Sequence, residues 1–253
     1  SLLDGATKID KLVKILKERG ATACAMTDHG NMYGAVKFYK ACNKNGINPI
    51  IGTEFYICPD LNDKSGKPKI SHLILIAKNQ QGYQNLIKLN SIAWVKGFYY
   101  KPRIDYNVLQ QYSEGLICLT ACIAGDLPKL LLAERFDEAE AYAIKMRDMF
   151  APGDFYIEVQ DHGIEEERKI LPHLFALAEK IGVKTVATND VHYLYPEDWE
   201  MQDVMLCIGT GKTIDDPDRM RMNGHEYYLK TEEEMRTLFA GHPEAVDNTL
   251  EIA

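Results

Sequence analysis

The chain has 253 residues, of which 46% are hydrophobic and 26% charged, and its formal net charge at pH 7 is −8. This length suits one large domain or two small ones, and the composition is ordinary for a globular protein. No apolar run reaches the ~20 residues that span a bilayer, the opening SLLDGATKID lacks the pattern of a signal peptide, and the negative charge argues against a free-standing DNA-binding protein. We therefore expect a cytoplasmic protein without a membrane partner, whose six scattered cysteines are reduced.

Short apolar runs alternate along the chain with longer amphipathic ones. Apolar residues at helical spacing (Ile9, Leu12, Val13 and Leu16), a Thr7–Asp10 capping box and a stop at Gly20 predict a first helix. The other expected helices span residues 32–45, 81–96, 136–150, 164–181, 198–207, 231–239 and 243–253. The expected strands span residues 23–27, 49–57, 72–77, 116–120, 155–160, 185–188 and 226–229. Pro172 is expected to break or restart its helix.

Repeated strand–helix units predict an α/β fold with parallel strands and helices outside them. At this length a TIM-like barrel is the leading architecture, and an open doubly wound sheet is the second. Residues 209–224 are rich in Thr, Asp, Gly and Arg, which is typical of a long excursion from the fold. We therefore expect a barrel over residues 1–208 and a C-terminal extension over residues 209–253.

Polar side chains follow the expected strands where the functional groups of an α/β barrel gather. They are, in chain order, Asp28 with His29, Glu54 (which lies within its expected strand), Cys122, and Asp190 with His192. Such imidazole, carboxylate and thiolate groups suit Zn, Mn or Fe better than Mg. Each group alone is more often a turn, core or salt-bridged residue. The prediction of a metal site therefore rests on their joint occurrence at successive strand ends, with Asp190 and His192 as the best pair because alternate strand residues share a face.

Several segments are long enough to compare with known families: TDHGNMYGAVKFYKAC, GINPIIGTEFYI, SHLILIAKN, YYKPRID, LTACIAGDLP and VATNDVHYL. Together, from Ser1 to about Tyr195, they resemble the PHP domain of bacterial replicative DNA polymerase III alpha subunits. The later segments IGTGKTIDD and YYLKTEEEM resemble the stretch that leads toward the palm and thumb of such polymerases. The resemblance implies a distorted (β/α)7 TIM-like barrel of the PHP type.

The resemblance also implies a rim that binds up to three divalent ions through nine residues. Seven of these positions would be Asp4, His29, Glu54, His72, Cys122, Asp190 and His192. Asp4 and His72 rest on the resemblance alone, since His72 opens its expected strand. Asp28 would orient His29 from outside the ligand set, or cap the following turn.

The family opens with a His-x-His strand upstream of the SLLDG motif. We therefore expect this chain to lack two ligands and the first barrel strand. The resulting gap would be left open, filled by another segment or filled by a neighbouring chain.

Three further residues are candidates for substrate binding. Arg103 could meet a phosphate, and Tyr100 beside it could stack on a base of a single strand. The alternative for this loop is a solvated barrel loop. His162 follows another expected strand and could line the pocket.

The resemblance implies a metal-dependent 3′–5′ exonuclease that proofreads DNA as part of a DNA polymerase, which is a nucleotidyltransferase. Its partners would be the single-stranded 3′ end of DNA, the rest of the alpha subunit and the replisome, in the bacterial cytoplasm. With two ligands missing, we expect weak or absent activity from this chain alone. One alternative is a non-catalytic structural domain of the polymerase, and another is a free-standing PHP phosphatase.

Overall fold

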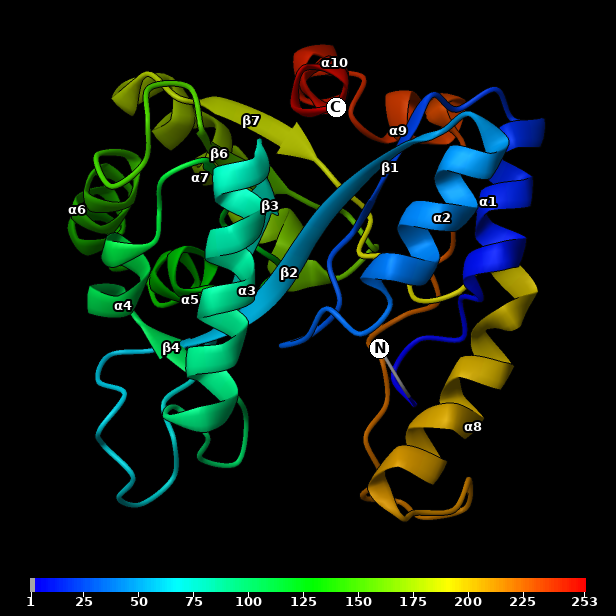
Figure 1. The fold of residues 1–253 in the computed structure, drawn as a ribbon, viewed down its shortest axis with the longest axis horizontal. Helices are drawn as coiled ribbons and strands as arrows, with labels where there is room; N and C mark the ends of the chain where they lie inside the picture. The colour runs from blue at the N-terminus through cyan, green and yellow to red at the C-terminus, as the bar shows by residue number, and fades with distance from the viewer. Residues whose placement is uncertain (1–2) are drawn as a thin grey trace.

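Seven strands form one sheet that curls around the middle of the molecule in the computed structural model, which describes residues 3–253. Ser1 and Leu2, the start of the SLLDG motif, lie outside the described residues. The sheet order is β1 (Ala23–Met26), β2 (Asn48–Cys58), β3 (Ser71–Ala77), β5 (Leu116–Leu119), β6 (Phe155–Val159) and β7 (Lys184–Ala187), with β4 (Arg103–Asp105) paired to β2. Figure 1 shows β2 crossing the molecule diagonally, with helices around the sheet.

β3 runs antiparallel to both of its neighbours, β2 and β5, whereas the other strand pairs are parallel. The prediction of an all-parallel sheet is therefore wrong at β3. The connection explains the reversal, because residues 59–70 contain turns and bends but no helix. A strand returns parallel to its predecessor only over a longer crossover, usually a helix.

β2 holds the sheet together because it pairs along nearly its whole length. Its first four residues pair with β1 and its last three with β4, while its other edge pairs with β3 from Gly52 to Ile57. A Cβ atom at Gly52 would lie 2.7 Å from the carbonyl oxygen of Leu75, so the two backbones approach closely where β2 leaves β1 and meets β3. Glu54 lies in the middle of this strand.

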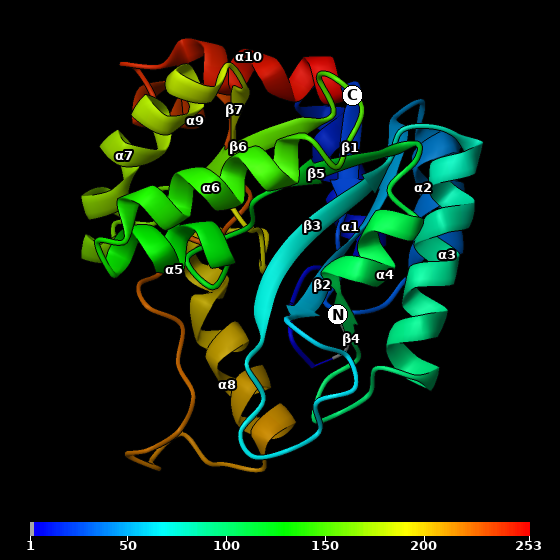
Figure 2. The same cartoon turned by 90° about the vertical axis from the view of Figure 1, so that its left-hand side faces the viewer.

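Helices cover the outside of the sheet. They are α1 (Ile9–Glu18), α2 (Ala35–Asn45), α3 (Gln80–Val95), α4 (Tyr106–Gln111), α5 (Asp126–Leu132), α6 (Phe136–Arg147), α7 (Glu165–Ile181), α8 (Trp199–Thr210), α9 (Glu232–Leu238) and α10 (Pro243–Ile252), with a 3₁₀ turn at Pro196–Asp198. Figure 2 shows α5, α6 and α7 on one side of the sheet and α3 with α4 on another. None of the helices in the described part of the chain has the length and apolar character needed to cross a membrane.

Most of the predicted helices and strands are present, with ends shifted by a few residues. Lys8 rather than Thr7 precedes α1, and no side-chain hydrogen bond caps that helix, so the predicted capping box is wrong. α7 continues through Pro172, so the predicted break is also wrong. Instead of a strand at residues 226–229, there is one isolated bridge between Tyr193 and Tyr228. The sequence did not predict β4, α4 or α5, which are short elements of three to seven residues.

Alternation along the strands divides the apolar side chains between two faces. Phe55 and Leu73 point outward into the large core under the helices. Ile74 and Ile76 belong to a smaller cluster on the inner face of the sheet. Because Glu54 and His72 alternate with Phe55 and Leu73, both point inward, and this is how an apolar sheet presents polar groups at its inner rim.

β1 and β7 stand at the two ends of the sheet order, and no pairing joins them among residues 3–253. α10 lies against β7 near this opening (Figure 1), where the Asn248 side chain donates to the Thr185 carbonyl at 2.8 Å. Asn48 at the start of β2 donates to the Ala253 carbonyl at 2.9 Å, and Ile252 packs on the inner cluster. A helix thus covers one end of this opening.

The C-terminal residues share the core of the barrel. Phe239, Ala245 and Val246 belong to the same buried cluster as the outer face of the sheet. The boundary at residues 208 and 209 stays a prediction, although the segment from residue 211 to 226 forms no helix or strand, as expected for an excursion.

Pro172 offers a test of this helix packing. Pro172→Ala should raise the free energy of unfolding by about 1–2 kcal/mol, because the new amide can donate to the carbonyl of Arg168 and the ring clash disappears. Urea unfolding followed by circular dichroism measures this change. Pro196→Ala is the control and should change stability little, because proline suits the first position of a helical turn. A Pro172→Ala variant no more stable than the wild type contradicts the prediction.

Candidate metal centre

Ligand-type side chains from six parts of the chain meet at one rim of the sheet. Reversal of β3 explains the place of His72, because the start of an antiparallel strand lies where its parallel neighbours end. In the register of the sheet His72 lies opposite Tyr56, and it also bridges to Gly125 in the loop after β5. That loop carries Cys122, so two segments that the sequence separates by fifty residues become neighbours.

The first cluster is built around the buried Glu54 carboxylate, which is 4% exposed. Glu54 Oε1 lies 3.1 Å from His72 Nδ1, and Glu54 Oε2 contacts His29 Nδ1. His29, Glu54 and His72 offer ligand atoms that all lie within 4.8 Å of one another. Cys122 Sγ lies 3.7 Å from His72 Nδ1 at the edge of this cluster. A carboxylate, two imidazoles and a thiol form a donor set that suits a transition-metal ion.

The second cluster shares His29 with the first. Asp4, His29 and His192 also offer ligand atoms within 4.8 Å of one another. Asp4 Oδ2 lies 3.4 Å from His29 Nε2, and the His29 and His192 rings are 6.0 Å apart between centroids. His29 therefore faces one cluster with each ring nitrogen, and the geometry allows two neighbouring cation positions.

The N-terminal segment is held at the site by a residue that the sequence did not single out. Gln202 on α8 is buried, accepts a hydrogen bond from the Ala6 amide at 2.9 Å and donates to the Asp4 carbonyl. The Thr7 amide donates to the His192 carbonyl at 3.1 Å. These bonds place the Asp4 carboxylate beside the imidazoles. A polar residue on an apolar helix face is the only signal that could have pointed to Gln202.

Asp190 and His192 lie in the loop after β7, not on a strand. Asp190 has a left-handed backbone with φ of 42°, so the alternating-strand argument for this pair is wrong even though both side chains reach the rim. His192 Nδ1 lies 2.7 Å from the Asp190 carbonyl oxygen. Since a carbonyl only accepts, Nδ1 carries the proton, which leaves Nε2 as the nitrogen able to bind a cation.

His162 supports this loop from behind. Its Nε2 donates to the Asn189 carbonyl at 2.9 Å, and its Nδ1 donates to Glu167 Oε1 at 2.7 Å. Burial by itself lowers the pKa of His162, but Glu167 outweighs burial and raises it. His162 is buried and stacks on Tyr227, so it positions the ligand loop, and the prediction that it lines a substrate pocket is wrong.

Glu158 on β6 plays the same part for Cys122. Its buried Oε2 accepts from the amide of Ala121, a residue with φ of 63°, at 2.9 Å. Thr188 donates to the other carboxylate oxygen. Burial raises the pKa of Glu158 to about 7. A non-glycine residue in the left-handed region is strained and persists where its surroundings hold it, so Glu158 fixes the turn that presents Cys122.

The titration of the first cluster reflects its mutual contacts. Burial acts to lower the pKa of His29, but the hydrogen bond and charge of Glu54, with the charges of Asp4 and Asp190, raise it to about 9. Burial acts to raise the pKa of Glu54, but His29 and His72 outweigh it and lower that pKa. Burial raises the pKa of the Cys122 thiol. Protons thus occupy the positions that a divalent cation would take.

The structure gives Arg103 a role other than phosphate binding. Arg103 is 2% exposed, and its guanidinium donates to the carbonyls of Leu61, Asp63 and Gly97 at 3.0–3.2 Å. The prediction that it meets a phosphate is therefore wrong. Tyr100, at 71% exposure, remains a candidate for stacking. Asp28 accepts from the Glu54 amide through its carbonyl at 3.1 Å, and the role of its side chain stays a prediction.

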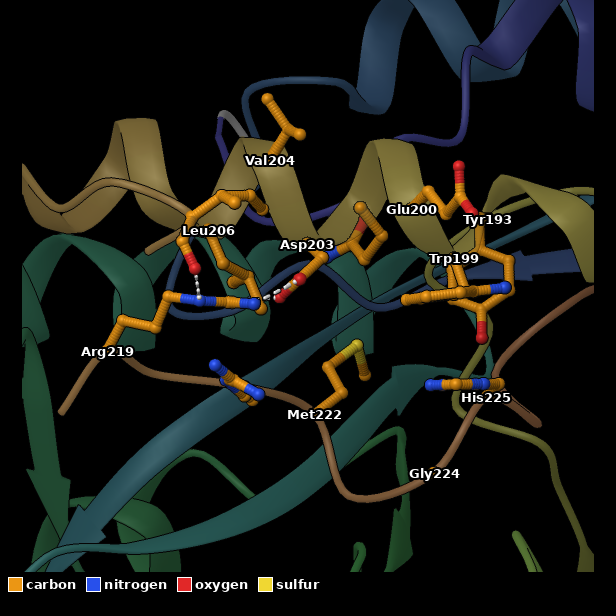
Figure 3. Close-up of a pocket in the computed structure, with 13 residues that line it drawn as sticks. Tyr193, Trp199, Glu200, Asp203, Val204, Leu206, Arg219, Met222, Gly224 and His225 are labelled. Atoms are coloured by element: carbon orange, nitrogen blue, oxygen red, sulfur yellow. Dashed lines mark hydrogen bonds and ion pairs between the residues drawn. The ribbon is translucent and has the colours of Figure 1, made fainter. Parts of the chain in front are cut away.

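A pocket of about 530 Å³ lies behind the second cluster, between α8 and the segment 211–226 (Figure 3). Its walls include Tyr193, which follows His192, and Gln202. Across the pocket Arg219 Nη2 pairs with Asp203 Oδ2 at 2.6 Å, and the Trp199 and His225 rings stack at 4.0 Å between centroids. These two pairs hold residues 211–226, which we call the excursion, against α8, the helix whose Gln202 anchors Asp4.

The sequence matches the PHP domain family over residues 1–162, more than half of the chain. The chain belongs to the PHP domain family. It is also similar along its whole length to DNA polymerase III subunit alpha of Treponema pallidum, Borreliella burgdorferi and Campylobacter jejuni, at 49%, 46% and 45% identity. The chain spans 22% of the length of each of these relatives.

Among solved structures, a candidate metal-dependent phosphoesterase of Bifidobacterium adolescentis aligns with 76% of this chain and 85% of its own. Its TM-score of 0.41 and identity of 14% are too low to inform the fold or function of this PHP domain.

Because Arg103 bonds backbone carbonyls and not a ligand, we expect its substitution to lower the stability of the fold without changing metal binding. Arg103→Lys should lower the free energy of unfolding by about 2–4 kcal/mol, because an ammonium cannot reach three carbonyls in the geometry of the guanidinium fork. Metal content, measured by atomic emission, should stay at the wild-type level. Arg135→Lys, at an exposed ion pair with Glu138, is the control and should change stability by less than about 0.5 kcal/mol. A stable Arg103→Lys variant would contradict the structural role.

The raised pKa of His29 predicts that metal binding releases protons. Because His29 is protonated below about pH 9 and must be neutral to bind a cation, affinity should rise with pH from 6 to 8, by roughly tenfold per unit for each displaced proton. Calorimetry of Zn²⁺ binding in two buffers of different ionisation enthalpy counts the protons. We expect at least one at pH 7, and fewer for His29→Asn. His173→Gln, which alters an exposed histidine on α7, should match the wild type. Binding without proton release contradicts the prediction.

Proposed function

We propose that this PHP domain is a metal-dependent phosphodiesterase that removes nucleotides from the 3′ end of single-stranded DNA. The observation that carries the proposal is the pair of ligand clusters that share His29, because two adjacent cation positions suit phosphoester hydrolysis. Bound divalent cations would supply Lewis-acid activation of water and neutralise charge on the phosphate.

The residues of this chain would divide the work as follows. His29, Glu54 and His72, with Cys122 beside them, would hold one ion. Asp4 and His192, with Asp190 beside them, would hold a neighbouring one, and His29 would serve one of the two ions at a time, because a neutral imidazole has a single free nitrogen. Zn, Mn and Fe fit this mixture of imidazole, carboxylate and thiolate better than Mg. The family resemblance allows up to three ions in total.

In the proposal the domain serves a DNA polymerase III alpha subunit, as the exonuclease that proofreads new DNA. Its partners would be the single-stranded 3′ end, the rest of the alpha subunit and the replisome, in the bacterial cytoplasm. Similarity along the whole chain to three polymerase subunits supports this setting over a free-standing phosphatase. The competing candidate is a non-catalytic domain. It is favoured by buried groups such as Gln202 and Glu158, whose hydrogen bonds hold the loops in place.

Asp190→Asn separates these two candidates. We expect the variant to lose most of its bound metal and at least about 100-fold of any 3′-end degradation, because a carboxylate beside the second cluster becomes a neutral amide. Metal content and degradation of a labelled single strand measure the two effects. They should be followed in this chain and in a version extended by the His-x-His strand that the family resemblance implies.

Asp215→Asn is the matched control, since Asp215 is exposed in the excursion and should matter to neither readout. Metal bound by both versions without any degradation would favour the structural candidate. If the extended version binds no metal, and Asp190→Asn equals the wild type in both readouts, the exonuclease proposal fails.

A further inference from the structure

Positive charge is concentrated in two stretches of this acidic chain. Residues 29–53 hold three lysines, residues 64–104 hold seven lysines and one arginine, and neither stretch contains an Asp or Glu. Since the whole chain has a net charge of −8, removing these 11 positive charges leaves −19 on all other residues. Arg103 is buried, Lys37 pairs with Asp10 and Lys78 pairs with Asp154. The other eight lysines are exposed, and they make the face built from these stretches one suited to a polyanion.

The same two stretches meet in a row of exposed aromatic rings, which we call the aromatic row: Tyr33, Trp94 and Phe98. The rings of Tyr33 and Trp94 lie 6.3 Å apart between centroids, and Trp94 stacks on Phe98 at 5.7 Å and 20°. These side chains are 76%, 42% and 48% exposed, respectively. Three touching rings are open to solvent, and both stretches that carry them lack Asp and Glu, so the row is suited to a partner.

The aromatic row is tied directly to the metal centre. The Trp94 indole N–H donates to the Gly30 carbonyl at 2.8 Å, and Gly30 follows the ligand His29 in the chain. Gly30 has φ of 61°, and a Cβ there would lie 2.8 Å from Pro102 and 3.1 Å from Tyr56. The ends of α3 and of the ligand loop are thus packed against each other, and the row keeps a fixed place beside the cations.

Lysines continue the surface from the row to the cluster. Lys101 Nζ lies 5.2 Å from the centre of the Tyr56 ring, whose own centre is 5.3 Å from that of His72 and 6.1 Å from that of His29. Lys96, at the end of α3 between Trp94 and Phe98, is exposed. A strand that lies on the row would meet these ammonium groups on its way to the metal ligands.

We propose that the aromatic row is a stacking platform for the bases of single-stranded DNA whose 3′ end lies at the metal centre. The inference deepens the proposed function and rests on it for the direction of the strand, but not for the binding itself. Aromatic rings bind any base through its π face, and lysines bind the phosphates between them. A duplex keeps its bases stacked internally, so the platform selects single strands.

Binding is measured in EDTA, so that no hydrolysis takes place, with a labelled oligo(dT) by fluorescence anisotropy. Trp94→Ala should weaken binding by roughly 5- to 150-fold, and Phe98→Ala by a similar or smaller factor within that range. Trp94→Phe, which keeps a ring but loses the bond to Gly30, should fall between Trp94→Ala and the wild type. In a Trp199→Phe background Trp94 is the only tryptophan, and oligo(dT) should quench its emission.

Matched variants test the charge and the location. Lys96→Gln and Lys101→Gln should each reduce the slope of log affinity against log salt by about 0.7. Lys212→Gln, an exposed lysine in the excursion, and Phe136→Ala, a 44% exposed ring at the start of α6, should leave the affinity unchanged. Circular dichroism confirms that each variant is folded.

Three results would overturn the platform. One is wild-type affinity for oligo(dT) in both Trp94→Ala and Phe98→Ala. Another is equal affinity for the single strand and a duplex of the same length. The third is loss of self-association on Trp94→Ala in a protein that does not bind oligo(dT), since the row would then be a protein contact. Because binding is measured in EDTA and hydrolysis only with added metal, failure of hydrolysis and failure of the platform remain separate outcomes.

Discussion

One buried carboxylate between two imidazoles organises the metal centre. Glu54 is held in the middle of β2 and reaches His29 on one side and His72 on the other. Removing a carboxylate from water costs several kcal/mol unless partners of opposite charge replace the solvent. In the absence of a cation, His29, whose pKa Glu54 raises, and the contact with His72 meet that need. A bound divalent cation would meet it as well. The mutual contacts of these three side chains therefore hold the rim together without a cation.

The reversed direction of β3 brings His72 to the Glu54 carboxylate. If β3 ran parallel to β2, His72 would lie at the far end of the strand from Glu54 and from the Cys122 loop. The antiparallel register instead sets His72 opposite Tyr56, two residues from Glu54. Strand alternation then turns both side chains inward, away from the helices that cover Phe55 and Leu73. A short, helix-free connection is thus what brings the imidazole to the cation site.

Local pattern was enough to predict most helices and strands and to single out His29 and Cys122 after strands and Glu54 within one, but it could not place His72 or Asp4. Their positions depend on the direction of one strand and on the anchoring of the N-terminal segment by Gln202, and neither leaves a periodic signal in the sequence. Arg103 and His162 were misjudged for a related reason. Charged residues near a site look alike in sequence whether they face solvent or backbone carbonyls, and only the fold shows that both are buried and donate hydrogen bonds to backbone carbonyls.

The acidic residues outside the ligand clusters support the loops rather than the cations. Ala121 and Asp190 both adopt left-handed backbone conformations, each of which costs about 1–3 kcal/mol for a non-glycine residue. Ala121 precedes the ligand candidate Cys122, and its amide donates directly to the buried Glu158 carboxylate. Asp190 is itself a ligand candidate, and its loop is held by His162, which bonds both the Asn189 carbonyl and the buried Glu167 carboxylate. Strain of this kind persists only where rigid neighbours enforce it. Glu158 lies on β6 and Glu167 on α7, so both carboxylates are fixed by regular secondary structure behind the rim. They can therefore hold the loop residues in the geometry that a cation requires.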